Sequence, residues 1–106
     1  MTGKQIVFST TGSEEEARKI AQYLVEQRLA ACVNLVPHIT SIYQWQGKIE
    51  EGREWLLLIK TSAEMFGRVQ AAICELHSYE LPECIAVDIA EASPAYLKWL
   101  ESLVGR

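Results

Sequence analysis

Two runs of β-branched, aromatic and aliphatic residues face each other along the chain, at 39–46 and 53–61. Such runs on either side of a glycine and charged residues are typical of a β-hairpin, and we expect the turn at Gly47-Lys48. Within the stretch from Ala31 to Thr61, arms of about ten or more residues would reach roughly 33 Å. A compact domain of this size has a radius of gyration of only about 13 Å. The pattern therefore predicts a hairpin whose tip projects from the domain.

Apolar residues at helical spacing predict one helix before the hairpin and another after it. The sequences Ser13 to Glu16 and Thr61 to Glu64 have the spacing of a capping box, so we expect the two helices to begin there. The expected apolar faces are Ala17, Ile20, Ala21, Leu24 and Val25 in the first helix, and Phe66, Val69, Ile73 and Leu76 in the second.

The remaining elements complete an α+β plan. Residues Gln5 to Ser9 read as a first strand, and the alternation from Cys84 to Ile89 predicts a fourth. Ser93-Pro94 is a typical start for a short last helix. The order is βαββαβ with an extra C-terminal helix, which is a ferredoxin-like sandwich in a single domain over residues 1–106. One helix layer leaves the other sheet face bare, and an apolar face there would have to meet another subunit.

Composition narrows the class of protein. The chain has 106 residues, 49% of them hydrophobic, which suits one folded domain. A net charge of −4 argues against non-specific nucleic-acid binding, and no apolar run approaches the length of a membrane span. Three cysteines without CxxC spacing argue against a disulfide framework. These features favour a soluble protein of the cytoplasm.

Candidate chemistry is sparse. No nucleophile and base stand at a recognisable spacing, so we do not expect an enzyme. His77 precedes the acidic loop with Glu80 and Glu83, next to Cys84, and imidazole with thiolate suits copper. A histidine at a helix C-terminus is more often a surface cap, and a strand cysteine is more often a small buried hydrophobe.

A second set of residues suggests a ligand pocket or a subunit interface. The set consists of Tyr43, Trp45, Lys48, Glu50, Lys60 and Tyr79. Lys60 ends the run LLLIK and could anchor an anionic ligand near Trp45 and Glu50 of a neighbouring chain, or it could be a snorkelling structural lysine. The charges at the tip, including Glu54, could instead simply keep the hairpin soluble.

Several of these stretches together resemble one protein family. The segments ACVNLVPHITSIYQWQGKIEE, LLLIKT, ELHSYELPE and YLKWL resemble the CutA family, the divalent-cation tolerance proteins, in the family's order. The resemblance implies a ferredoxin-like subunit in a tight homotrimer, similar in architecture to the PII signalling proteins. It also implies a cytoplasmic protein associated with tolerance to copper and other divalent metals.

The chain departs from the family at the proposed copper ligands. Some members have a cysteine at the end of the first strand and two adjacent histidines before the loop, where this chain has Ser9 and Leu76, so that only His77 matches. The first functional hypothesis is a trimer that binds divalent metal ions, copper above all, without requiring one as a cofactor. The alternative is a PII-like signalling or interaction trimer that binds a small anionic ligand at the subunit interface.

Overall fold

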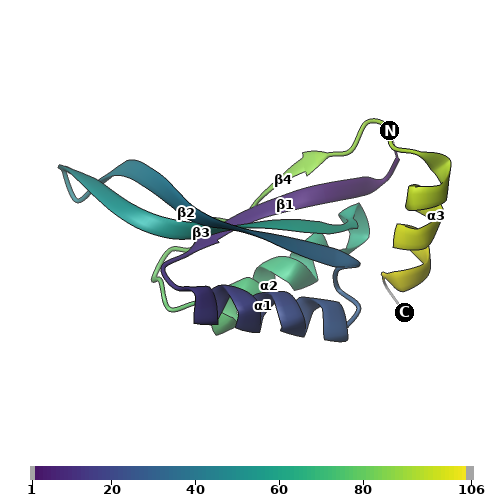
Figure 1. Cartoon of the computed structure of the whole chain (residues 1–106), viewed down its shortest axis with the longest axis horizontal. Helices are drawn as coiled ribbons and strands as arrows, with labels where there is room; N and C mark the ends of the chain where they lie inside the picture. Colours follow the sequence, from purple (N-terminus) through teal and green to yellow (C-terminus); the bar gives the residue numbers. More distant parts are fainter. Residues whose placement is uncertain (1, 105–106) are drawn as a thin grey trace.

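The chain folds as a four-stranded antiparallel sheet with two helices on one face and a third at one end (Figure 1). The computed structural model describes residues 2–104. Its elements are β1 (Lys4–Thr11), α1 (Glu14–Glu26), β2 (Cys32–Trp45), β3 (Lys48–Ser62), the 3-10 turn η1 (Ala63–Met65), α2 (Phe66–Leu76), β4 (Ile85–Asp88) and α3 (Pro94–Leu103). The strand order β2-β3-β1-β4 confirms the expected ferredoxin-like plan with an additional helix.

The main core lies between the sheet and the helices α1 and α2. Alternate side chains of a strand point to the same face, so one face of β1 and β3 meets the apolar sides of both helices. The fully buried residues of this layer are Val7, Leu57 and Ile59 from the strands, and Ala17, Ile20, Leu24, Val69 and Ile73 from the helices. Val25, expected on the apolar face of α1, is 42% exposed.

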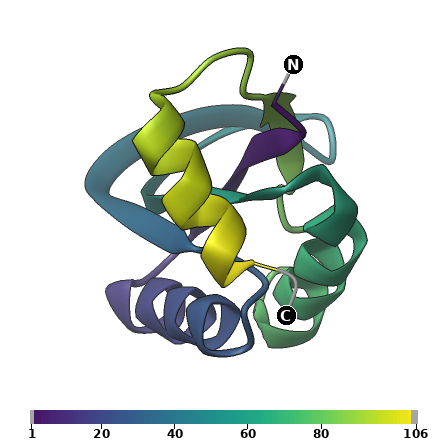
Figure 2. The ribbon, with the colours of Figure 1, turned by 90° about the vertical axis from the view of Figure 1, so that its right-hand side faces the viewer.

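Helix α3 closes the end of the domain that lies opposite the hairpin tip (Figure 2). Its Leu100 is fully buried and packs with Ala31 and Val104 in a second, smaller cluster. Pro94 stands in the first turn of the helix, where a backbone N–H would have no helical partner in any case. Helix α3 therefore covers one end of the sheet and leaves the face opposite α1 and α2 uncovered.

The hairpin of β2 and β3 extends well beyond the rest of the sheet, as its length predicts. The pairing of β1 with β3 ends at Thr11 and Trp55, so the hairpin beyond that point pairs only with itself. We call this part, residues 39–54, the arm. The molecule measures 44 × 25 × 23 Å, and the arm forms one end of its long axis (Figure 1).

A β-bulge sits where the arm leaves the sheet. Val36 pairs with Leu56 and Ile39 pairs with Glu54, so Pro37 and His38 together oppose Trp55. His38 has a φ of 60°, and its ring lies 5.9 Å from the ring of Trp55. The extra residue shifts the alternation of β2, because it lets odd-numbered residues continue the face that even-numbered residues form before the bulge. Tyr43 and Trp45 therefore share the face of Val36.

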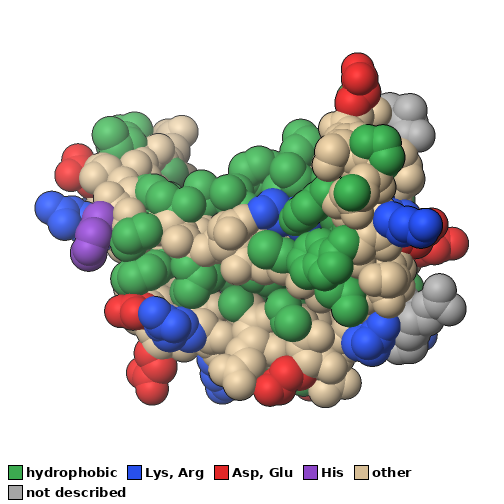
Figure 3. All heavy atoms as spheres, turned by 45° about the vertical axis from the view of Figure 1, so that its right-hand side comes forward, with side chains coloured by type: hydrophobic (Ala, Val, Ile, Leu, Met, Phe, Trp, Pro, Cys, Tyr) green, Lys and Arg blue, Asp and Glu red, His purple; other side chains and the backbone are tan. Residues whose placement is uncertain are grey.

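The sheet face turned away from α1 and α2 is apolar, and we call it the open face. By register and alternation its apolar side chains are Ile6, Phe8, Val36, Leu56, Leu58, Ile85 and Val87, and Lys4, Cys32, Asn34 and Lys60 share the face. Ile85 and Val87 are 59% and 52% exposed. Figure 3 shows hydrophobic side chains gathered between the arm and the C-terminal helix, with a basic side chain in their midst. The bare face expected from the single helix layer is present, and it is apolar.

Some local expectations are wrong at the level of individual residues. The hairpin turn is Gln46-Gly47, with φ of 51° and 80°, rather than Gly47-Lys48. Thr61 does not cap a helix, because it remains in β3, where its hydroxyl donates to the Leu29 carbonyl, and η1 precedes α2. The fourth strand is shorter than expected, since β4 spans Ile85–Asp88 and includes neither Cys84 nor Ile89.

The first helix cap is half of the expected capping box. The Ser13 hydroxyl accepts a hydrogen bond from the backbone N–H of Glu16 at 3.2 Å, as predicted. The Glu16 carboxylate does not return to the cap; it accepts hydrogen bonds from the backbone N–H and the hydroxyl of Ser78. The same glutamate thus fixes the start of the loop between α2 and β4 against α1.

The turn geometry gives a stability prediction with a matched control. Gly47 has a φ of 80° in a two-residue turn, whereas Gly52 in the arm has open space around its Cα and no positive φ. Gly47→Ala should lower the free energy of unfolding by about 1 kcal/mol or more, because alanine is strained there. Gly52→Ala should be neutral or slightly stabilising. Denaturant unfolding and amide hydrogen exchange in the arm measure both, and equal effects would contradict the turn assignment.

Candidate functional site

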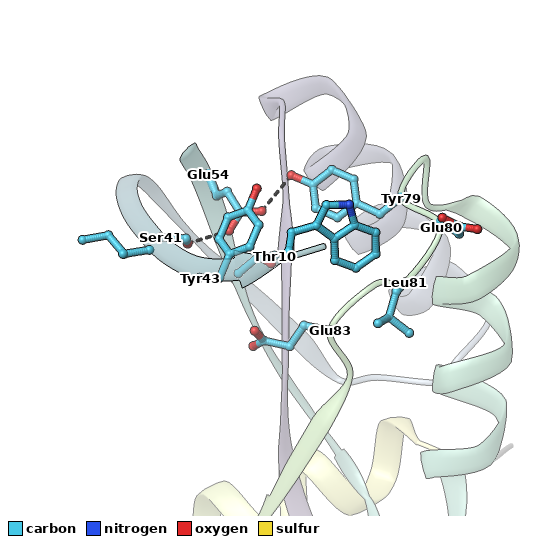
Figure 4. Close-up of a pocket in the computed structure, with 10 residues that line it drawn as sticks. Thr10, Ser41, Tyr43, Glu54, Tyr79, Glu80, Leu81 and Glu83 are labelled. Atoms are coloured by element: carbon cyan, nitrogen blue, oxygen red, sulfur yellow. Dashed lines mark hydrogen bonds between the residues drawn. The ribbon is translucent and has the colours of Figure 1, made fainter. Parts of the chain in front are cut away.

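A hollow of about 640 Å³ lies where the arm meets the body of the domain (Figure 4). Strands β1, β2 and β3 supply one part of its lining, and the loop between α2 and β4 supplies the other. The lining residues are Thr10, Ser41, Ile42, Tyr43, Trp45, Glu54, Tyr79, Glu80, Leu81 and Glu83. The hollow thus brings together Tyr43, Trp45, Tyr79, Glu80 and Glu83 from the two sets of candidate residues.

Glu54 is the polar centre of this hollow. Its carboxylate accepts a hydrogen bond of 2.6 Å from the Ser41 hydroxyl and one of 2.7 Å from the Tyr79 hydroxyl. Figure 4 shows both bonds converging on it. Glu54 was interpreted from the sequence as a solubilising charge, and only the bulge in β2 reveals that it shares a face with Ser41. The three residues tie the loop to the arm.

Among the described residues, the hollow carries acidic side chains and no basic side chain to neutralise them. Burial and the nearby charge of Glu54 raise the pKa of the Glu83 carboxyl above its ordinary value. Burial, with the hydrogen bond to Glu54, also raises the pKa of Tyr79, so its hydroxyl stays protonated and can donate. None of the ten lining residues in the described part of the chain is basic. The site is therefore acidic and aromatic and suits a cation.

His77 lies beside the hollow but is built into the fold. It is only 8% exposed, and its Nε2 lies 2.6 Å from the Thr10 carbonyl oxygen. A carbonyl can only accept, so Nε2 carries the proton, and Nδ1 accepts the backbone N–H of Tyr79 at 3.0 Å. Nδ1 also lies 3.4 Å from the Glu16 carboxylate. Both ring nitrogens are thus engaged with the protein.

The four residues of the predicted metal set are not arranged as a metal centre. Cys84 is half-buried against the core, and burial raises the pKa of its thiol. Glu80 and Glu83 line the hollow, and His77 is not among its lining residues. Across residues 2–104, no group of three or more His, Cys, Asp or Glu side chains is placed to hold a metal ion.

The predicted basic residues lie elsewhere. Lys48 pairs with Trp45 at the tip of the arm and is exposed, as is Glu50, which pairs with Tyr43. Lys60 stands on the open face, and its ammonium donates to the Asn34 side-chain carbonyl. Twelve residues of β3 separate Lys48 from Lys60, which is roughly 40 Å of strand. One subunit therefore cannot bring both lysines and Trp45 around one ligand.

This combination of a ferredoxin-like sheet, a projecting arm and a hollow at its base defines a class of small α+β proteins with one uncovered sheet face. The family model described as CutA1 divalent ion tolerance protein matches residues 5–103. The chain belongs to this family.

Individual relatives agree over nearly the whole chain. The divalent-cation tolerance protein CutA of Thermus thermophilus is 49% identical over 102 residues, which cover 96% of this chain and 99% of the relative. Mouse protein CutA is 45% identical over 91% of this chain, but the match spans only 54% of the mouse protein. The solved structure of CutA from Xylella fastidiosa superposes with a TM-score of 0.94 at 42% identity, over 97% of this chain and 99% of that one.

No described helix has the length and hydrophobicity needed to cross a membrane.

The placement of His77 predicts a structural effect of its removal. His77→Ala should lower the free energy of unfolding by about 2 kcal/mol, because the Thr10 carbonyl and the Tyr79 N–H lose their partner inside the fold. The matched control is His38→Ala, because His38 is exposed. We expect it to lower the free energy of unfolding by less than about 1 kcal/mol. Denaturant titration of both variants measures the difference, and equal losses would argue against a structural role for His77.

Proposed function

We propose that the chain is the subunit of a cytoplasmic homotrimer that acts in divalent-cation tolerance as a binding protein rather than as an enzyme. The observation that carries this proposal is the open face. A continuous apolar surface of this kind on a soluble domain favours contact with another protein surface. The CutA resemblance supports three copies of the chain, arranged as in PII-like proteins.

The surroundings of the open face support its burial in an assembly. Tyr96 and Trp99 of α3 are 39% and 44% exposed, and their rings lie 5.4 Å apart. Burial, with the nearby Cys32 of β2, raises the pKa of Tyr96, and the register places Cys32 beside Lys60 on the open face. At the other end, the arm carries Tyr43 and Trp45 on the same face. Aromatic residues thus flank the apolar surface at both ends, as they do in many interfaces.

Assembly through the open face can be tested with two valines of similar exposure. Val87 on β4 is 52% exposed on the open face, and Val25 on α1 is 42% exposed on the opposite side. Sedimentation equilibrium should give a trimer for the wild type and for Val25→Glu. Val87→Glu should dissociate at micromolar concentration, because a carboxylate would be buried without a partner. A monomeric wild type, or a trimeric Val87→Glu, would contradict the proposal.

Divalent-cation binding is the second part of the proposed function, with copper as the leading ion. Its support is the family, the net charge of −4 and the carboxylates of Glu54, Glu80 and Glu83 around the hollow. A copper ion at His77 has less support, since either ring nitrogen would have to give up a hydrogen bond to the protein. We therefore propose weak binding through carboxylate oxygens and not a closed site of histidine and cysteine.

This metal proposal predicts a specific pattern of affinity. Cu²⁺ should bind more weakly than micromolar, because too few donors converge to close a coordination shell. Glu80→Gln should lower the affinity more than His77→Ala does, because His77 holds the loop that carries Glu80 and Glu83 but supplies no ligand atom. Isothermal titration of the wild type, His77→Ala and Glu80→Gln with Cu²⁺ measures these affinities. Tight binding that disappears in His77→Ala would restore His77 as a ligand, and no saturable binding in any of them would remove the metal part of the proposal.

The alternative, a small anionic ligand at the subunit interface, has one observation in its favour. Lys60 is a cation among the apolar side chains of the open face, with the neutral amide of Asn34 as its hydrogen-bond partner. Such a site would have to combine Lys60 of one subunit with Trp45 and Lys48 of another. We rank this function below metal tolerance because the hollow beside Trp45 is lined by carboxylates, which would repel an anion.

A further inference from the structure

The open face carries a charge that the fold of one subunit does not neutralise. Lys60 lies between the apolar side chains of the open face, next to Cys32 and Ile6 on the neighbouring strands. Within residues 2–104 the polar partner of its ammonium is the Asn34 side-chain carbonyl, and no carboxylate forms an ion pair with it. Lys4 on the same face differs, because it lies 3.9 Å from Glu101.

The hollow shows the opposite case, because it has carboxylates without a basic partner in the described part of the chain. Glu54 and Glu83 both line the hollow, the charge of Glu54 disfavours ionisation of Glu83, and no lysine or arginine is among the described lining residues. The hydroxyls of Ser41 and Tyr79 orient the Glu54 carboxylate without neutralising its charge. The site has aromatic walls and three carboxylates, which is the environment that an ammonium group prefers.

These two features cannot meet within one chain. Glu54 and Lys60 lie on the same face of β3, six residues apart, which corresponds to roughly 20 Å of strand. A lysine side chain spans only a fraction of that distance. If the open face is covered by a second copy, however, Lys60 loses its water and leaves an unpaired ammonium in an apolar contact, which is strongly unfavourable.

We propose that Lys60 of one subunit enters the acidic hollow of the next and pairs there with Glu54 and Glu83. The inference rests on the proposed homotrimer and names the polar contact that orients its subunits. In the trimer, Lys60 would then hold Glu54 and Glu83, so that Glu80 is the carboxylate of the hollow left for a metal ion. One patch, around Lys60, meets a different patch, the hollow under the arm. Such a head-to-tail contact closes into a ring when the rotation between copies allows it, and three copies form the smallest ring beyond a pair.

The proposal also explains why the Glu83 carboxylate stands in a place that disfavours its charge. In an isolated subunit, burial and mutual repulsion oppose the ionisation of Glu83, so Glu83→Gln would be neutral or stabilising at neutral pH. With an ammonium in the hollow, the same substitution removes an ion-pair partner and weakens assembly. The effect of Glu83→Gln on the trimer therefore has opposite signs in the two cases.

Charge reversal at the two positions tests the contact. Lys60→Glu and Glu83→Lys should each raise the dissociation constant of the trimer on the order of a hundredfold, as expected when one member of a buried pair is reversed. The double variant should recover most of the wild-type affinity. Lys19→Glu, which makes the same change on exposed α1, is the matched control and should leave assembly unchanged. Analytical ultracentrifugation measures all five proteins.

Mixing the two single variants shows whether the contact is between subunits. A chain with Lys60→Glu and a chain with Glu83→Lys have complementary charges at both of their mutual contacts, so the mixture should form trimers in which two of three contacts are restored. Circular dichroism of each variant confirms that it is folded, and Glu83→Gln, in an exposed loop, provides a milder test if a reversal prevents folding.

Each outcome decides the matter. A wild type that is not a trimer would overturn the proposed function itself. A trimeric wild type whose affinity is unchanged by both reversals, or a double variant no better than the single ones, would overturn only the Lys60 contact. Trimers in all variants with Glu83→Gln more stable at neutral pH would also overturn it and would leave the hollow to a soluble cation.

Discussion

The antiparallel pairing of β2 with β3 is the interaction on which the rest of the molecule depends. Near the body this ladder belongs to the sheet, because β3 also pairs with β1 as far as Trp55. Beyond that point it continues without a second partner and becomes the arm. The bulge at Pro37 and His38 marks the transition and decides which side chains of the arm face the hollow. Core, arm and hollow are thus parts of one pairing register.

Much of the fold follows from the sequence because it depends on local periodicity. Residue spacing predicts the amphipathic helices, the Ser13 cap and the length of the hairpin. It also predicts a single helix layer. Residue spacing does not predict the bulge, since nothing in the sequence separates Pro37 and His38 from the long strand around them. Missing that single extra residue reverses the facing of every later residue in β2, including Tyr43 and Trp45.

The site was harder to predict than the fold for a related reason. The composition of their loop points to Tyr79 and Glu83, but the sequence indicates only a solvated charge for Glu54, because its partners, Ser41 and Tyr79, are distant in sequence. His77 was weighed as a ligand or a surface cap, and the structure shows a third role. Its ring bridges the Thr10 carbonyl and the Tyr79 N–H, and thereby fixes the loop that walls the hollow.

Hydrogen bonds hold the loop between α2 and β4 on two sides. Glu16 and His77 fix its first residues to α1 and β1, whereas Tyr79 reaches across to Glu54 at the base of the arm. Contacts within one chain therefore hold the walls of the hollow in place. A preformed acidic site loses little conformational entropy when a partner binds. If the charge it receives is Lys60 of the next subunit, the same polar contact would both satisfy the open face and orient the copies around the ring.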